Sequence, residues 1–233
     1  MKDRALVCVP LTDNSFDDML FSARQAEKLA ADAVEFRIDF LDPAGMDDLK
    51  DINKLEDLNI KKILTCMPCW EGGKFNGAES TRISMMSSIS KFFDYITIEL
   101  RCCDLSLFVR SARKQNPCIK VILSYHDFES TPELNTILNI IKLEKKHGAD
   151  IAKIAFTPCD LEDVLRVMEA LVKGRAGIPV IAISMGDAGK ISRVIAPVFG
   201  SYLTFASLGE GRESAPGQMS IADVRGWLEK FSW

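Results

Sequence analysis

The feature of the sequence that most constrains the fold is a regular alternation: eight short apolar, β-branched runs are each followed by a run with helical periodicity. The expected strands are residues 5–10, 33–39, 62–66, 95–100, 119–125, 151–156, 179–183 and 202–206. The expected helices are residues 15–31, 46–57, 79–92, 105–115, 132–147, 161–173, 190–195 and 221–231. Eight such units in 233 residues predict an α/β fold, a single (β/α)₈ TIM barrel that forms one domain over residues 1–233. An open doubly wound sheet is the alternative, although such sheets usually have fewer strands.

Composition excludes several classes of protein. A 47% share of hydrophobic residues suits a sizeable core, and a net charge of −4 leaves no basic footprint for nucleic acid. We find no apolar run near the roughly 18–20 residues of a membrane span, and the first apolar run is too short for a signal peptide. Seven scattered cysteines favour a reduced, cytoplasmic protein. We therefore expect a small-molecule partner, with no nucleic acid and no membrane.

Charged residues in the expected strands fall on one face. In the strand 33–39 the apolar residues alternate with charged ones, and similar positions recur in later strands. In a barrel, the apolar face meets the helices and the other face meets the axis. The residues expected to point inward are Glu35, Arg37, Asp39, Glu99, His126 and Lys153. Such residues are either functional or form an ion network that closes the barrel, and both interpretations stay open here.

Lys153 lies in the apolar strand that spans residues 149–156. Burial among apolar groups disfavours the charged form of an amine. A neutral amine is a nucleophile toward a ketone or aldehyde, with which it forms a Schiff base. The alternative is a lysine whose ammonium group extends from the strand end into solvent.

His126 ends the strand that precedes the strand of Lys153, and we expect the two side chains at matching depth. Adjacent strands lie about 4.8 Å apart, so both side chains can reach one substrate, and a general base beside a Schiff-base lysine is a coherent pair. Glu71 belongs to the segment 70–73, which follows the third strand and contains two glycines. Glu71 is placed to orient His126, unless it is an ordinary solvated glutamate.

Other segments near the same strand ends carry weaker signals. Cys66 and Cys69 have C-x-x-C spacing, but a zinc site needs two further ligands, so we predict no metal. Arg193 enters the helix after the seventh strand, and its guanidinium group suits a carboxylate ligand. Residues 214–218, with Ser214 and Gln218, form a polar loop at the barrel mouth.

Taken together, these segments resemble the type I 3-dehydroquinate dehydratase family of the shikimate pathway. The matching segments are residues 35–39 (Glu-Phe-Arg-Ile-Asp), 71–73 (Glu-Gly-Gly), 124–128 (Ser-Tyr-His-Asp-Phe), Lys153, 184–186 with 192–193, and 214–218 (Ser-Ala-Pro-Gly-Gln). They span nearly the whole chain in the family's order. The family has a (β/α)₈ barrel and is usually dimeric, so the resemblance implies a homodimer.

The resemblance also implies a role for each matching residue. Lys153 forms an imine with the ketone of 3-dehydroquinate, His126 moves protons, and Glu71 orients His126. Residues that hold the hydroxyls and the carboxylate of the substrate are Glu35, Arg37, Arg193, Ser214 and Gln218. The implied product is 3-dehydroshikimate, and the implied chemistry needs no cofactor and no metal.

The sequence departs from the family pattern at two positions. Met67 stands where the family commonly has an arginine, which puts one substrate contact in doubt, and Thr97 stands where an aspartate is common. We expect Lys74 or Arg82 to replace the missing cation. Two other functions stay open: a class I Schiff-base aldolase, and a catalytically silent barrel that acts as a binding protein.

Overall fold

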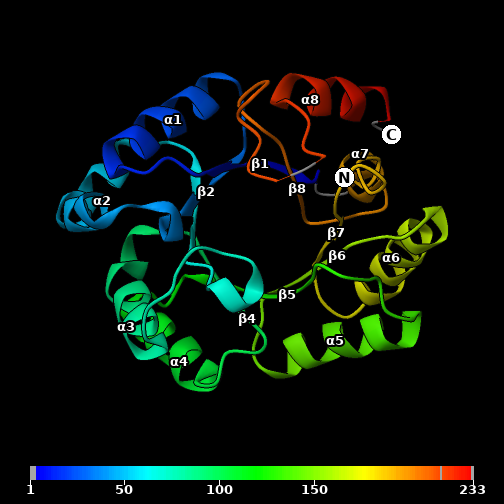
Figure 1. Cartoon of the computed structure of the whole chain (residues 1–233), viewed down its shortest axis with the longest axis horizontal. Helices are drawn as coiled ribbons and strands as arrows, with labels where there is room; N and C mark the ends of the chain where they lie inside the picture. Colours follow the sequence, from blue (N-terminus) through cyan, green and yellow to red (C-terminus); the bar gives the residue numbers. More distant parts are fainter. Residues whose placement is uncertain (1–3, 216, 232–233) are drawn as a thin grey trace.

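The computed structural model describes residues 4–215 and 217–231, so Pro216 of the loop 214–218 lies outside the described residues. Eight parallel strands surround a central axis, and helices surround the strands (Figure 1). The strands are β1 (Leu6–Leu11), β2 (Ala33–Arg37), β3 (Lys61–Thr65), β4 (Tyr95–Glu99), β5 (Lys120–Asp127), β6 (Ile151–Phe156), β7 (Val180–Ser184) and β8 (Leu203–Phe205). The predicted α/β barrel is confirmed.

The helices lie between the strands, mostly within a few residues of their predicted ranges. They are α1 (Phe16–Lys28), α2 (Pro43–Asp47), α3 (Glu79–Ile89), α4 (Leu105–Gln115), α5 (Leu134–Lys146), α6 (Leu161–Gly174), α7 (Ser192–Val198) and α8 (Ile221–Lys230). The predicted helix 46–57 is wrong in its start and type. The helical segment begins at Pro43, and its greater part is the 3₁₀ helix η2 (Asp48–Asp57). Asp42 accepts a hydrogen bond from the backbone N of Gly45 (2.7 Å), which stabilises the earlier start.

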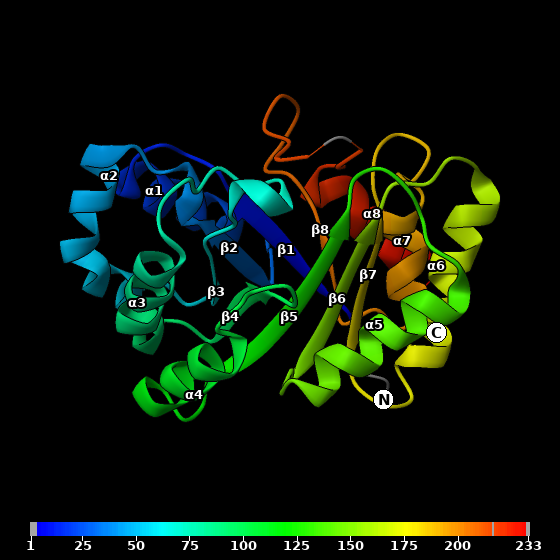
Figure 2. The same cartoon turned by 60° about the horizontal axis from the view of Figure 1, so that its bottom comes forward.

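The strand order brings the sheet round into a nearly closed barrel. β1 pairs with both β2 and β8, and the remaining strands follow in chain order to β7. Between β7 and the entry to β8, Tyr202 N donates a hydrogen bond to Val180 O (2.8 Å). The open-sheet alternative is therefore wrong. Figure 2 shows the barrel from its side, with the segments that follow β3, β5 and β8 rising at the same end.

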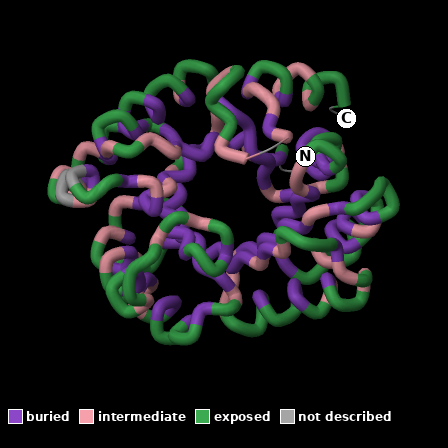
Figure 3. Tube along the Cα trace, viewed as in Figure 1, coloured by how far each residue is buried: buried purple, intermediate pink, exposed green. Residues whose placement is uncertain are grey.

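The apolar core has two layers, one inside the barrel and one between strands and helices. The inner layer fills the end of the barrel where the strands begin, and it includes Cys8, Ala33, Ile63, Tyr95, Ile122, Ile151, Ile181 and Leu203. The outer layer includes Val34, Phe36, Ile96 and Ile98, the partners that alternate with inward residues. Figure 3 shows the resulting ring of buried residues around the axis. None of the described helices is long and apolar enough to cross a membrane.

Glu144 is an unusual residue in the outer layer. It lies on the inner face of α5 with Ile137, Ile140 and Ile141, and its exposure is 0%. Within the described residues, neither of its carboxyl oxygens has a hydrogen bond of good geometry, and a contact with the backbone of Lys153 only partly offsets the burial. Burial raises the pKa of Glu144 well above its ordinary value. The carboxyl group is therefore protonated in the folded protein at a pH where an unfolded glutamate is ionised.

Glu144 predicts a stability that falls as the pH rises. Because its folded-state pKa exceeds the unfolded value, its stabilising effect is complete below the ordinary pKa of 4.5 and is lost as the pH rises through the folded pKa. Glu144→Leu should raise the free energy of unfolding at pH 8 by about 1–3 kcal/mol, the cost of a buried unpaired polar group. Urea unfolding at pH 5 and pH 8 measures this, with exposed Glu56→Gln as control. A variant less stable than the parent at pH 8 would contradict the assignment.

Candidate active site

Most of the predicted site residues line one cavity of about 160 Å³. The cavity lies where the strands end, which is the end of a TIM barrel that carries catalytic residues. The predicted residues that line it are Glu35, Arg37, His126, Lys153, Arg193, Ser214 and Gln218. Glu71, whose side chain is fully buried, lies behind His126 and not on the cavity wall. The structure thus brings together side chains from widely separated parts of the chain.

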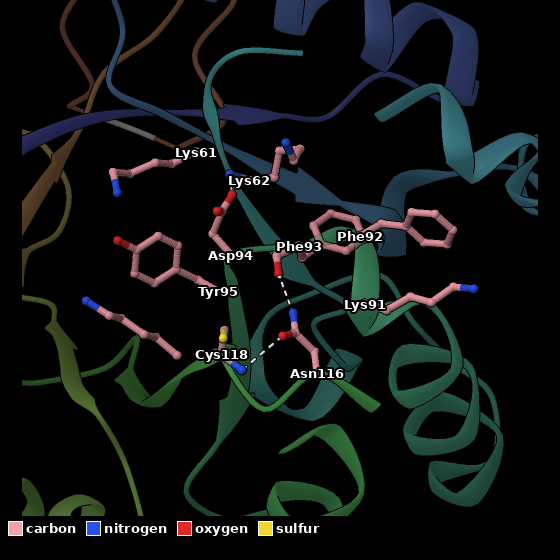
Figure 4. A pocket seen from close by; sticks show the side chains of 10 residues that line it. Lys61, Lys62, Lys91, Phe92, Phe93, Asp94, Tyr95, Asn116 and Cys118 are labelled. Carbon is pink, nitrogen blue, oxygen red and sulfur yellow. Dashed lines mark hydrogen bonds between the residues drawn. The ribbon is translucent and has the colours of Figure 1, made fainter. Parts of the chain in front are cut away.

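A second cavity, of about 330 Å³, lies at the opposite end of the barrel (Figure 4). Lys61, Tyr95 and Lys120, the first residues of β3, β4 and β5, are on its wall with two further lysines, Lys62 and Lys91. Four of its polar and charged residues, Lys61, Lys91, Asp94 and Lys120, are exposed to solvent. None of the predicted site residues is in this cavity.

Lys153 lies in the middle of β6 and points into the barrel, with an exposure of 7%. Its Nζ is 3.7 Å from Glu35 Oε1 and 4.7 Å from the centre of the Phe205 ring. Thr65 Oγ1 donates a hydrogen bond to the same Glu35 oxygen (2.8 Å). The amine is thus buried beside one carboxylate and one aromatic face, and the alternative of a lysine that extends into solvent is wrong.

Lys153 and His126 do not lie at the same depth in the barrel, so this prediction is wrong. His126 is one inward-facing position further along its strand than the residue that pairs with Lys153. The β5–β6 register pairs Lys153 with Ser124, while His126 is opposite Ala155. β5 also continues past its predicted end at residue 125 to Asp127, so His126 lies within the strand. His126 is therefore nearer the barrel mouth than the Cα of Lys153. The four-carbon lysine side chain spans part of this offset, and both residues reach the same cavity.

Glu71 holds His126 through one carboxylate oxygen. Glu71 Oε1 accepts a hydrogen bond from His126 N (2.8 Å) and lies 3.3 Å from His126 Nδ1. A proton on Nδ1 suits this contact, and it leaves the lone pair of Nε2 free to act as a base. Glu71 belongs to the short 3₁₀ helix η3 (Cys69–Glu71) that follows β3. The structure thus places Glu71 against His126, and the orienting role of Glu71 stays a prediction.

The two groups shift each other's protonation. Burial lowers the pKa of His126, the charges of Lys153 and Arg37 lower it further, and Glu71 opposes the change. Burial raises the pKa of Glu71, but hydrogen bonds with His126 and Arg101 outweigh it, so the net shift is downward. A neutral imidazole beside an ionised carboxylate is the resulting state near pH 7.

Phe128 is a site residue that the sequence reasoning did not assign. Its ring stacks on the imidazole of His126, with centres 5.9 Å apart and planes 11° apart. Gly72, at φ 86°, lies under this ring, and a Cβ there would be 2.5 Å from a Phe128 ring atom. The alternation along β5 contains a signal, because Phe128 is two residues after His126 and so shares its face.

Arg193 is a buried arginine whose guanidinium group lacks a hydrogen-bond partner at one nitrogen. Its exposure is 4%, and its Nε has no hydrogen-bond partner among the described residues. Burial lowers the pKa of Arg193 to about 10. Leaving a buried guanidinium unpaired is costly, so this group suits an anionic ligand in the cavity.

The other polar residues of the wall hold one another in place. Arg37 donates to Asp39 from Nε (2.9 Å) and Nη2 (2.8 Å). Gln218 Nε2 donates to Ser214 Oγ (2.9 Å), and Ser214 N donates to Gln218 Oε1 (2.9 Å). These contacts fix the side chains while leaving them on the cavity wall.

The two cations expected to replace an arginine at position 67 lie in different places. Met67 itself is on the cavity wall. Arg82 is fully buried, pairs with Glu79 and Glu99, and donates to Cys66 O. These contacts hold it behind the cavity wall, away from the substrate. Lys74 is exposed, and its Nζ lies 4.2 Å from the centre of the Phe40 ring, which lines the cavity. Lys74 is therefore the better placed of the two.

Within the described ranges, no group of three or more His, Cys, Asp or Glu residues is arranged to hold a metal ion. Cys66 is buried and Cys69 is exposed, and both are free thiols. Burial raises the pKa of the Cys66 thiol, which disfavours the reactive thiolate there.

The pKa of His126 is directly measurable, since the chain has two histidines. An NMR titration of the imidazole protons should give a midpoint below the ordinary 6.5 for His126. Glu71→Gln should lower the midpoint further, because Glu71 stabilises the imidazolium. A His147→Gln variant assigns the two resonances. A midpoint above 6.5, or one that rises in Glu71→Gln, would show that the geometry of this pair is different.

Comparison with known proteins identifies the family of the chain. A family model described as type I 3-dehydroquinase matches residues 7–232. A 3-dehydroquinate dehydratase from Methanobrevibacter smithii is 37% identical over 229 residues, which cover 98% of this chain and 96% of that protein. A bifunctional 3-dehydroquinate dehydratase/shikimate dehydrogenase from Arabidopsis thaliana is 36% identical over 96% of this chain, which spans 37% of the plant protein.

Solved structures agree with the same assignment. The type I 3-dehydroquinate dehydratase from Clostridium difficile has a TM-score of 0.87 and 30% identity, over 97% of this chain and 92% of that chain. The 3-dehydroquinate dehydratase from Geobacillus kaustophilus has a TM-score of 0.89 and 28% identity, over 98% and 91%. The match extends over nearly the whole chain in sequence and in structure. The chain therefore belongs to the type I 3-dehydroquinase family.

Proposed function

We propose that this chain dehydrates 3-dehydroquinate to 3-dehydroshikimate through a Schiff base on Lys153. The observation that carries the proposal is the placement of Lys153 and His126 on adjacent strands, facing one cavity, with Glu71 bonded to His126. Membership of the dehydratase family supports the reaction and the shikimate pathway. The C. difficile relative was solved with covalently modified comenic acid, which is compatible with covalent chemistry in this fold.

The proposed reaction begins with attack of the Lys153 amine on the substrate ketone. Loss of water gives a protonated imine, which withdraws electrons and acidifies the neighbouring C–H bond. His126 removes that proton at carbon 2, and it then protonates the hydroxyl group that leaves. Water releases the product and restores the amine. His126 thus serves as base and then acid, and an ordinarily neutral imidazole suits the first of these steps.

The remaining wall residues are proposed to bind the polar groups of the substrate. The buried guanidinium of Arg193, whose Nε has no partner among the described residues, suits the carboxylate. Arg37, held by Asp39, offers a second cation, and Glu35 accepts from a hydroxyl group. Ser214 and Gln218, which bond to each other, close the same wall. A homodimer, a single domain and a cytoplasmic location remain predictions from the resemblance and the composition.

The two alternative functions fit the site less well. A sugar-phosphate aldolase also uses a barrel lysine, but it would need a dedicated phosphate site in the loops after β7 and β8. The structure has the polar pair Ser214 and Gln218 in the latter loop. A silent barrel would not need an unpaired buried arginine beside a lysine and a histidine.

Borohydride added with 3-dehydroquinate should trap a stable adduct on the peptide that contains Lys153. Reduction converts the imine into a secondary amine, which mass spectrometry detects. Lys153→Ala should form no adduct. His126→Ala should still form one while losing roughly 10²- to 10⁴-fold in turnover, the usual share of general acid–base catalysis. Turnover by the parent with no adduct at Lys153 would reject the Schiff base.

The replacement at Met67 predicts weaker substrate binding. A charge-assisted hydrogen bond contributes about 1.5–3 kcal/mol, so its absence should weaken binding roughly ten- to a hundredfold relative to an arginine-bearing relative. If Lys74 substitutes, Lys74→Ala should raise KM much more in the parent than in the Met67→Arg variant. Lys61→Ala, an exposed lysine at the opposite end of the barrel, is the matched control. Equal losses in the two backgrounds would rule out compensation by Lys74.

A further inference from the structure

Arg101 makes contacts that the proposed mechanism does not yet use. It lies in the turn just beyond the end of β4 at Glu99. Its Nε donates to Glu71 Oε2 (2.9 Å), and its Nη2 bonds to the same oxygen. Nη2 also lies 3.3 Å from the backbone O of His126, to which it donates. One guanidinium thus contacts both members of the Glu71–His126 pair.

The carboxylate of Glu71 divides its two oxygens between two partners. Oε1 faces the backbone N and the imidazole of His126, while Oε2 faces Arg101. A carboxylate held at both oxygens cannot rotate about its terminal torsion without breaking charge-assisted bonds. Arg101 therefore determines the plane in which Glu71 meets the imidazole.

Two aromatic rings hold Arg101 in turn. Its Cζ lies 4.9 Å from the centre of the Tyr125 ring and 5.8 Å from the centre of the Trp70 ring. Both distances are in the range of cation–π contacts. The side chain of Arg101 is nevertheless 46% exposed, while that of Glu71 is fully buried. The guanidinium is therefore placed by its neighbours at a position that solvent can reach.

We propose that Arg101 is a positioning residue for the dehydration: it fixes the Glu71 carboxylate so that His126 presents Nε2 to the substrate. This inference rests on the proposed function for its kinetic consequence, and on the contacts alone for its effect on His126. Arg101 is not on the wall of the cavity, so it acts through Glu71 and does not touch substrate.

Several charges act on the pair, and Arg101 is the cation bonded directly to Glu71. Lys153 from β6 and Arg37 from β2 act on His126, while Glu99 from β4 and Glu144 from α5 interact with Glu71. The hydrogen bond from Arg101 lowers the pKa of Glu71. Removing a neighbouring cation favours protonation of the pair as a whole. Without Arg101, the Glu71–His126 pair should therefore take up protons at higher pH.

The test compares Arg101→Ala and Arg101→Lys with the parent. Arg101→Ala should lower kcat about tenfold or more with KM within about threefold, because positioning is lost while the substrate contacts remain. The acid limb of the kcat/KM profile should move to higher pH. Arg101→Lys keeps the positive charge but lacks the two N–H donors of the guanidinium group, so its kcat should lie between those of Arg101→Ala and the parent. Guanidinium ion should partly restore Arg101→Ala, because the vacated position is open to solvent, and it should not restore His126→Ala.

Arg113→Ala is the matched control. Arg113 is 40% exposed and is also paired with a carboxylate, Asp150, but at the start of β6, away from the cavity. The Arg113→Ala variant removes this surface ion pair, and it should leave kcat and the pH profile unchanged. An unchanged kcat and an unmoved acid limb in Arg101→Ala would overturn the proposal.

A second readout separates this inference from the proposed reaction. In an NMR titration, the His126 midpoint should rise in Arg101→Ala and stay in place in Arg113→Ala, whether or not the protein turns over 3-dehydroquinate. If the His126 midpoint rises in Arg101→Ala but the parent does not turn over 3-dehydroquinate, the proposed reaction is overturned and the coupling of Arg101 to His126 is kept. A midpoint that does not move would overturn the role of Arg101 even in an active enzyme.

Discussion

The structure depends on the pairing of charges that a closed barrel forces inward. Every second residue of each strand faces the axis, so a charged residue at such a position must find a partner or a ligand. Glu35 meets Lys153 and Thr65, Glu99 meets Arg82, and Glu71 meets His126 and Arg101. Burial still shifts these groups, and it raises the pKa of Glu99 to about 7 even though Arg82 opposes the change. Among the described residues, the Nε of the buried Arg193 has no hydrogen-bond partner.

Much of this arrangement follows from periodicity in the sequence. Period-two alternation places Glu35, Glu99 and Lys153 inside the barrel without any knowledge of the fold's details. The order of eight strands and eight helices then places their C-terminal ends together. The resemblance to a family added the roles, which the alternation alone does not contain. Strand and helix boundaries were less accessible, as at Pro43, where a side-chain contact of Asp42 moves the start of the helix.

The misses share a physical cause: they concern relations between neighbouring elements. The depth of His126 relative to Lys153 depends on the register of their strands. Hydrogen bonding between β5 and β6 sets this register, and the sequence pattern within each strand does not reveal it. Arg82 looked available from its position in the chain, yet it is committed to Glu79 and Glu99. Phe128 continues the inward phase of β5 one step beyond the strand, so extending the alternation would have found it. Arg101 lies in the turn after β4, where alternation no longer applies, and only its contacts with Glu71 show its place.

The contact between Glu35 and Lys153 has a consequence for electrostatic reorganisation during the proposed reaction. The amine that attacks the ketone is neutral, whereas the protonated imine carries a positive charge on the lysine nitrogen. Glu35 Oε1, 3.7 Å from Nζ and held by Thr65, therefore lies beside the atom on which that charge appears. Because the carboxylate is already fixed there, the cavity wall needs little rearrangement when the imine forms, and such preorganisation reduces the work of forming the covalent intermediate. Glu35 thus serves the bound intermediate from the position that it holds in the free enzyme.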